Sequence, residues 1–295
     1  MKNYLTYKGM FAQSSGAVKF IIAVSVFFLC SFIFSELGLL FMKFISDKII
    51  AMEVFQLMAA LGGFVFSALA ISYLISPKPF EYLSIKKTNG YFFIMSVICI
   101  VVAIPFINFT TILNENLTLP EWMSAIEKCI KELEKQQSDI ANSFLEKQSF
   151  SMYLFNLFVI ALIPAVGEEL LFRGLIQKAL YHRTKNVHIA IWCTGILFSA
   201  IHLQFYGFFP RMFMGVLFGY FVAWSGSLWV SMACHFMNNA LIITSKYLYP
   251  TAEETFIESF GSRDIILAIV SFILIITICY FIQKTRSEES EYKTT

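Results

Sequence analysis

The chain has 295 residues, of which 58% are hydrophobic, 17% are aromatic and only 14% are charged. A soluble domain is about 45–50% apolar and about 25% charged, so this composition excludes an ordinary soluble protein. The net charge of +2 gives no reason to expect a nucleic-acid partner. The composition indicates instead a chain that lies largely in lipid.

Apolar runs of about 20 residues, the length that crosses a bilayer as a helix, recur along the sequence. In chain order they predict membrane-spanning helices at 18–42, 54–75, 91–112, 151–176, 188–205, 208–224, 228–246 and 264–283. We therefore expect an all-α fold, a polytopic integral membrane protein with about eight transmembrane helices in a single membrane domain of residues 1–295.

The connections between the predicted spans differ in charge. Lysine and arginine gather after the second span, after the fourth span and near the chain end, at Lys78, Lys86, Lys87, Lys178, Arg183, Lys185, Lys284, Arg286 and Lys293. Because basic connections stay in the cytoplasm, this distribution predicts a multi-pass protein with both termini cytoplasmic. The composition, rich in phenylalanine and isoleucine, favours a bacterial cytoplasmic membrane, with the endoplasmic reticulum as the alternative.

One polar segment, residues 113–150, separates the third span from the fourth. Within it Trp122, Ile126, Ile130 and Leu133 recur at helical intervals among charged residues. This pattern predicts an extramembrane amphipathic helix that lies on the outer membrane face or over the bundle. A covering role is favoured over a dedicated substrate-binding role.

Charged and polar side chains inside three predicted spans are the most informative feature of the sequence. They lie in spans four, five and seven, and are Glu168, Glu169, Arg173, His202, His235 and Asn239. An ionisable group at the bilayer centre costs about 2.5–3.5 kcal/mol on insertion scales, so such groups usually face a bundle interior or a wet cavity.

Counting along the chain predicts that these groups share one depth. Glu168 and His202 lie equally far before and after the turn expected near Lys185, and His235 lies near the middle of span seven. In an antiparallel helix pair, equal distances from the turn mean similar depth. We therefore expect the three spans to bring their polar groups together.

Helix geometry assigns different tasks to the two glutamates. Glu169 and Arg173 are four residues apart and can pair on one face, whereas Glu168 is rotated by about 100°. Pro164 is expected to kink the helix beside Glu168. A carboxylate near two imidazoles and an amide suits hydrolysis, in which the carboxylate accepts a proton from water and the other groups stabilise an oxyanion.

These residues resemble the motifs of a known family. Glu168-Glu169-Leu-Leu-Phe-Arg173 matches EExxxR, Phe198-Ser-Ala-Ile-His202 matches FxxxH, and His235-Phe-Met-Asn-Asn239 matches HxxxN. Together and in this order they are similar to the CAAX protease and bacteriocin-processing family, also called the Abi family. The likeness covers about residues 151–245, which it identifies as the catalytic core helices.

The resemblance implies an intramembrane endopeptidase in which Glu168 activates water, and Glu169 and Arg173 orient and balance it. His202 would position the water, while His235 and Asn239 would stabilise the oxyanion. The family reading implies no cofactor. Zinc, held by Glu168, His202 and His235, is the alternative, because three protein ligands and an open position are typical of catalytic zinc.

Two other classes of protein remain as alternatives. A transporter also places Glu and His in mid-membrane, but no repeat symmetry accompanies them here. A non-catalytic adaptor or bacteriocin immunity protein would keep its function when Glu168 is replaced by Gln, whereas a protease would lose it. The expected partners are a peptide or protein substrate and membrane lipid; the sequence does not select the substrate.

Overall fold

The computed structural model describes residues 7–145, 149–251 and 255–285, and these residues contain helices but no strand. Each of the eight predicted spans contains a helix, although the fifth is helical only as far as Ala200. The long helices are α1 (Gly16–Met42), α2 to α3 (Lys48–Ile75), α5 (Gly90–Glu115), α7 to α9 (Phe150–Thr184), α10 (Val187–Ala200), α11 (Phe208–Ser225), α12 (Leu228–Leu248) and α14 (Ile265–Lys284). The predicted fold class, a helical polytopic membrane protein, is confirmed.

Six of these helices are long and apolar enough to cross a membrane. The other two are α10, which has 14 residues, and α12, whose 21 residues include the polar His235, Asn238 and Asn239. The count of eight spans therefore stays a prediction. Short helices α4 (Pro79–Tyr82) and α13 (Phe256–Ser259) lie in the connections.

Two long helices contain wider, π-helical turns. The first consists of α2 (Lys48–Ala60), η1 (Leu61–Phe66) and α3 (Ser67–Ile75); the second of α7 (Phe150–Asn156), η3 (Leu157–Leu162), α8 (Ile163–Leu171), η4 (Phe172–Ile176) and α9 (Gln177–Thr184). Pro164 is the second residue after η3 and has no N–H to donate, which explains the irregular turn before it. The motif glutamates thus lie on a short α-helical piece between two π turns.

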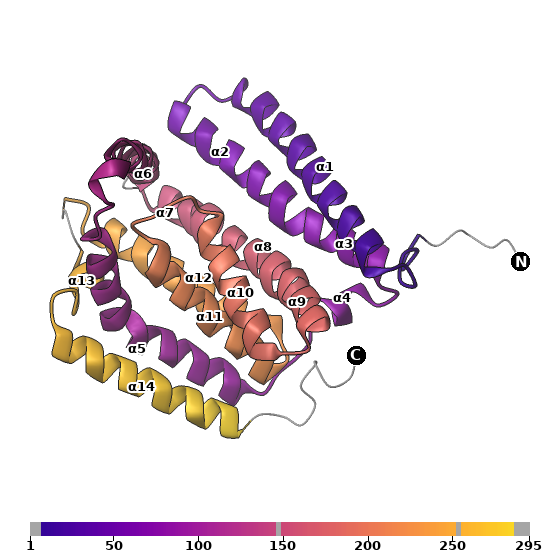
Figure 1. Ribbon diagram of the computed structural model, residues 1–295. Coiled ribbons are helices and arrows are strands. Elements are labelled where there is room, and N and C mark those ends of the chain that lie inside the picture. Colours follow the sequence, from indigo (N-terminus) through magenta and orange to yellow (C-terminus); the bar gives the residue numbers. More distant parts are fainter. Residues whose placement is uncertain (1–6, 146–148, 252–254, 286–295) are drawn as a thin grey trace, which may run out of the picture.

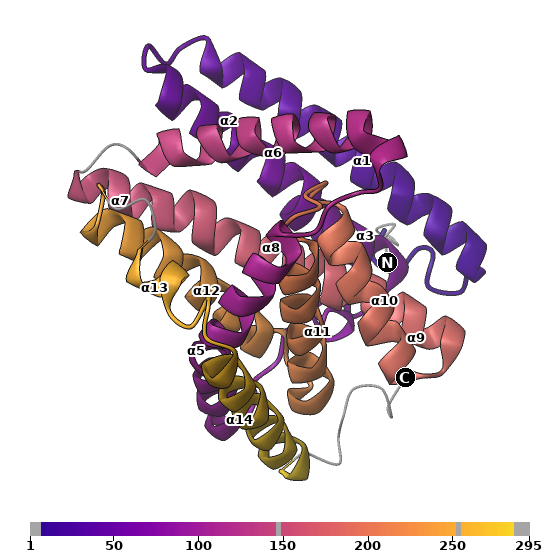
Figure 2. The same ribbon diagram turned by 60° about the vertical axis from the view of Figure 1, so that its left-hand side comes forward.

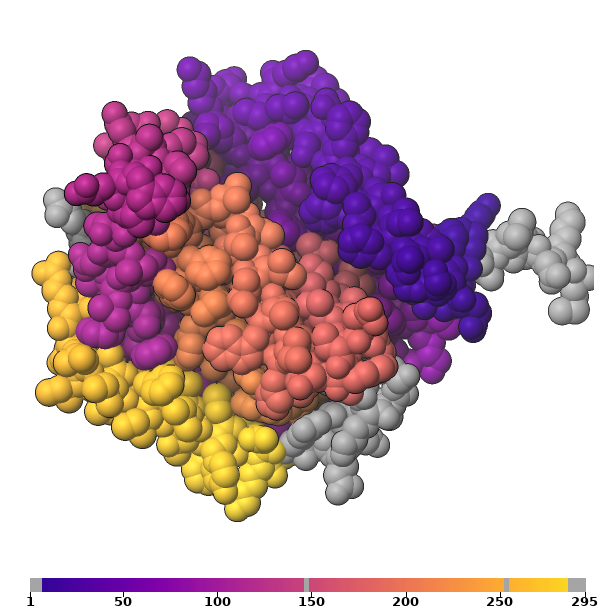
Figure 3. Space-filling model, viewed as in Figure 1, coloured from indigo at the N-terminus to yellow at the C-terminus, as the bar shows by residue number. Residues whose placement is uncertain are grey.

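The bundle has a central group of helices flanked on both sides. In α11, 61% of the residues are buried, whereas none of the most apolar 18 residues of α1 is buried. Helix α11 is therefore a core helix and α1 a peripheral one. The hairpin of α1 with α2 and α3 packs on one side, and the pair α5 and α14 on the other (Figure 1). The space-filling view shows both groups flanking α10 and α11 (Figure 3).

Polar residues fix where several helices begin and end. Asp47 accepts hydrogen bonds from the first amides of α2, Asn186 from those of α10 and Asp264 from those of α14. Lys185, with φ of 54°, ends α9 in the left-handed conformation, as expected for a turn near this residue. The motif helix therefore reverses directly into α10.

The predicted amphipathic segment contains one long helix. A short 3₁₀ turn, η2 (Glu121–Met123), leads into α6 (Ser124–Leu145), which lies within the expected 113–150 segment, although α5 extends into that segment as far as Glu115. The placement of this segment outside the membrane stays a prediction.

Candidate active site

Glu169 is the centre of a buried hydrogen-bonded group. Its Oε1 accepts from Arg173 Nη1 at 2.6 Å and lies 3.1 Å from His235 Nδ1. The Glu169 and Arg173 side chains are fully buried, and His235 is 6% exposed. The predicted pairing of Glu169 with Arg173 is confirmed. The bond to His235 joins α8 to α12 and was not part of the prediction.

The two glycines of α11 let Arg173 reach the helix backbone. Arg173 Nη2 donates to the carbonyl of Gly215 at 2.7 Å. A Cβ at Gly215 would lie 3.1 Å from the Phe198 ring, and one at Gly219 would lie 2.7 Å from Gln177 Oε1. Gln177 Nε2 in turn donates to the Gly219 carbonyl at 3.2 Å. The four-residue spacing of Gly215 and Gly219 thus provides room for buried polar side chains from the motif helix.

Glu168 faces the opposite nitrogen of the same imidazole. Glu168 Oε2 lies 3.9 Å from His235 Nε2, and the Glu168 side chain is 12% exposed, whereas that of Glu169 is 0% exposed. Because a carboxylate can only accept, the contact with Glu169 places a proton on His235 Nδ1. His235 therefore lies between the two glutamates, with Nε2 directed toward the more accessible one.

Aromatic rings hold the charged groups in place. The Arg173 guanidinium carbon lies 4.6 Å from the centre of the Phe198 ring and 5.4 Å from that of Phe218. Phe218 stacks on His235, and Phe198 meets the His235 ring edge-on. Such cation–π contacts are worth about 2 kcal/mol or more where water is excluded.

His202 does not lie within a helix, contrary to the predicted span 188–205. Helix α10 ends at Ala200, and Leu203 adopts a left-handed φ of 54°. His202 therefore lies in the turn between α10 and α11. Its Nδ1 donates to the Phe198 carbonyl at 2.8 Å, which leaves Nε2 as an acceptor. Phe198 packs edge-on against His202 as well as His235, so one ring contacts both histidines.

Asn239 is not joined to the other predicted residues. It lies one helical turn after His235 on α12, and its Oδ1 accepts from Asn238 Nδ2 at 3.2 Å. Within the described residues it makes no hydrogen bond to the motif glutamates or to His202. A role for Asn239 therefore requires a substrate group between it and the other side chains.

Arg211 is a basic residue near the site that the sequence reasoning missed. It lies in the first turn of α11, where its Nη2 donates to Gln204 Oε1, and its charge interacts with that of Glu168. An arginine near the start of a predicted span is normally interpreted as reaching for the membrane surface. Its position nine residues after His202, the last residue of the FxxxH motif, was the available signal.

The three side chains named as zinc ligands are not gathered as a metal site. Across residues 7–145, 149–251 and 255–285, no group of three His, Cys, Asp or Glu side chains is arranged to hold a metal ion. His235 Nδ1 already contacts Glu169, which leaves only Nε2 for a ligand. Whether zinc takes part stays a prediction.

Comparison with known proteins points to the same part of the chain. Residues 150–241 match the family model described as type II CAAX prenyl endopeptidase Rce1-like. An 86-residue stretch is 30% identical to the uncharacterized protein YpbD of Bacillus subtilis (strain 168) and covers 28% of this chain and 41% of that protein. The match thus spans less than half of the relative. No solved structure matches the chain.

Proposed function

We propose that the chain is an intramembrane endopeptidase in which Glu168 activates water, because residues 150–241 match the Rce1-like family model. A protease of this family acts on a peptide or protein substrate in a membrane environment. The observation that carries the proposed mechanism is the His235 imidazole, which lies between Glu169 and the more accessible Glu168.

The proposed first step is attack of water on the scissile carbonyl. Glu168 accepts a proton from the water as its oxygen bonds to the carbonyl carbon, and the carbonyl oxygen becomes negative. His202 Nε2, an acceptor, suits the second water hydrogen because its Nδ1 is bound to the Phe198 carbonyl. The water is thus held by two acceptors with its lone pair free for attack.

The second step is the breaking of the peptide bond. His235, oriented by the contact of its Nδ1 with Glu169, would donate from Nε2 to the oxyanion. Asn239 would add its amide N–H to the same oxygen. Glu168 then transfers its proton to the leaving amine as the carbon–nitrogen bond breaks, which returns both carboxylates to their starting state.

The charges of the site support this assignment. Arg173 pairs with Glu169, and the His235 imidazole lies between Glu169 and Glu168, so each carboxylate has a basic partner. A buried group of this kind is stable only when each charge has a partner. Arg173 is fully buried behind Glu169, so it is suited to positioning and charge balance, whereas Glu168 retains access to a substrate.

Comparison of new protein N-termini in membranes tests the proposal. Cells carrying the wild type are compared with cells carrying Glu168→Gln, with and without a zinc chelator. Glu36→Gln is the matched control, because Glu36 is an exposed residue of the peripheral helix α1. Termini that vanish with Glu168→Gln but persist with Glu36→Gln would support the proposal and identify substrates.

The other outcomes separate the alternatives. Termini that also vanish with the chelator would favour a zinc-dependent protease. If the Glu168→Gln protein accumulates in the membrane and leaves all termini unchanged, the proposed peptidase activity is wrong. A function retained by that variant would then favour an adaptor or immunity protein.

A further inference from the structure

Helix α6 runs across the end of the bundle instead of along it. Figure 1 shows α6 end-on while α1, α2 and α14 lie in the plane of the view, and Figure 2 shows it lengthwise. It packs on α2, α7 and α12. Because the long apolar helices run along the bundle axis, a helix at right angles to them lies parallel to a membrane plane.

The side of α6 that faces the protein makes several polar contacts, beside the half-buried Ile130 and the buried Phe144. Glu134 Oε1 accepts from the backbone amides of Phe205 and Tyr206 at 2.6 and 3.2 Å. Glu127 accepts from the Tyr206 hydroxyl, and Gln137 accepts from Gln204.

Four apolar residues of η2 and α6 are exposed. Trp122 is 82% exposed, Ile126 51%, Leu133 53% and Ile140 44%. The three aliphatic residues are spaced by seven, so they follow one side of the helix. Four large apolar side chains in one exposed stripe need a covering partner.

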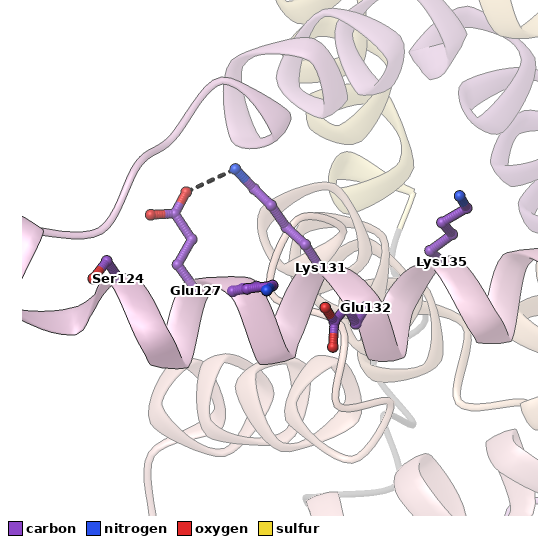
Figure 4. A pocket seen from close by; sticks show the side chains of 6 residues that line it. Ser124, Glu127, Lys131, Glu132 and Lys135 are labelled. Carbon is purple, nitrogen blue, oxygen red and sulfur yellow. Dashed lines mark ion pairs between the residues drawn. The ribbon is translucent and has the colours of Figure 1, made fainter.

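The other side of the helix is charged. Lys131 and Lys135 lie there along a shallow hollow that Glu127 of the protein-facing side borders (Figure 4), and the Lys131 Nζ is 2.8 Å from Glu127 Oε1. The hydrogen bond from Lys131 lowers the pKa of Glu127, so this pair stays ionised at neutral pH. Lys128 lines the same hollow.

Two observations identify the partner as lipid. At the same end of the bundle, the apolar surface of α1 continues outward to Phe41 and Phe44, which are 45% and 79% exposed, so a lipid-facing surface reaches the level of α6. Trp122 and the flanking lysines are also the residue types that lie at the boundary between headgroups and acyl chains.

We propose that α6 is an interfacial helix whose Trp122, Ile126, Leu133 and Ile140 lie in the lipid headgroup region while its polar side holds the turn that carries His202. The lipid contact is independent of the proposed chemistry, so it holds even if the chain is not a peptidase. The lipid contact is favourable because each Å² of apolar surface removed from water contributes about 25 cal/mol.

Spin labels on the full-length protein in phospholipid nanodiscs test the proposal. Single cysteines Ile126→Cys and Leu133→Cys probe the apolar stripe, and Lys128→Cys and Lys135→Cys are the matched controls on the charged side. Each is made in a background in which Cys129 and the partly exposed Cys30, Cys193 and Cys279 are replaced by Ser, so that the native thiols left are the buried Cys99 and Cys234. Power saturation then compares collisions with O₂, which concentrates in lipid, and with a water-soluble nickel chelate.

The expected ratio of O₂ to nickel accessibility, relative to free label in water, is above one at 126 and 133 and below one at 128 and 135. Equal, water-like ratios at all four positions would overturn the proposal. Low accessibility to both reagents at 126 and 133 would also overturn it, because this result indicates a protein partner or a second copy of the chain on the stripe. Fluorescence quenching of Trp122 by brominated lipids provides a label-free check.

Discussion

Arg173 combines complete burial with a permanent charge, and its loss has a predictable result. Its guanidinium bonds Glu169 and the Gly215 carbonyl with no exposure to solvent. Removing one partner of a buried ion pair costs about 3–5 kcal/mol, because the other charge stays buried alone. We therefore expect Arg173→Met to lower the free energy of unfolding by about this amount, measured by chemical denaturation of the purified protein.

The double variant Glu169→Gln with Arg173→Met separates the pair from the arginine. Since both charges are removed, we expect it to lose less stability than Arg173→Met alone. Arg211→Met is the matched control, because Arg211 is only partly buried and no ion pair joins it to a carboxylate among the described residues. Equal losses in Arg173→Met and Arg211→Met would contradict this prediction.

For individual residues, the sequence predicts contacts within a helix better than contacts between helices. The Glu169–Arg173 pair follows from a spacing of four residues and was found as expected. The bond from His235 to Glu169 depends on how α12 is rotated against α8, and no residue spacing encodes that rotation. Arg211 was missed because a charge at a span end has an ordinary explanation.

Hydrogen bonds from other helices hold the turn between α10 and α11, so the contribution of each bond can be tested by removing it. Glu134 of α6 accepts hydrogen bonds from the backbone amides of both Phe205 and Tyr206. A hydrogen bond to a charged group contributes about 1.5–3 kcal/mol. We therefore expect Glu134→Ala to speed hydrogen exchange at Phe205 and Tyr206 by roughly ten- to a hundredfold, measured by exchange with mass spectrometry.

Glu132→Ala is the control for this change. It removes a carboxylate from the same helix, but Glu132 lines the charged hollow and not the turn. Exchange at residues 205 and 206 should be unchanged in that variant. If Glu134→Ala also leaves exchange there unchanged, then Asn114, which bonds the Phe205 carbonyl and the Phe209 amide, holds the turn without help from α6.

Helix positions were predicted well from apolar runs, but their ends were not. The second span begins at Lys48 instead of 54 because Asp47 caps it, and the fourth continues to Thr184 because no breaker intervenes before Lys185. The fifth ends early because Leu203 takes a left-handed conformation that leucine rarely adopts. Neither this turn nor the π turns have a sequence signal that hydropathy could detect.

The whole molecule has two chemically different ends. Helices α4 and α9 lie at one end with the start of α1 and the end of α14, and α6 and α13 lie at the other (Figure 1). The basic residues Lys78, Lys178, Arg183 and Lys284 fall at the first end. The positive-inside rule predicts that this end is cytoplasmic, and it therefore predicts that α6 and the turn with His202 face the opposite compartment.

Thiol labelling of intact bacterial cells that express the chain tests this orientation. In the background used for the spin labels, a membrane-impermeant maleimide should label Lys135→Cys, on the charged side of α6, without permeabilisation. It should label Arg183→Cys, in the last turn of α9, only after the cells are opened. The reverse pattern would place the basic end outside the cell. A substrate would then reach the turn with His202 from the cytoplasm.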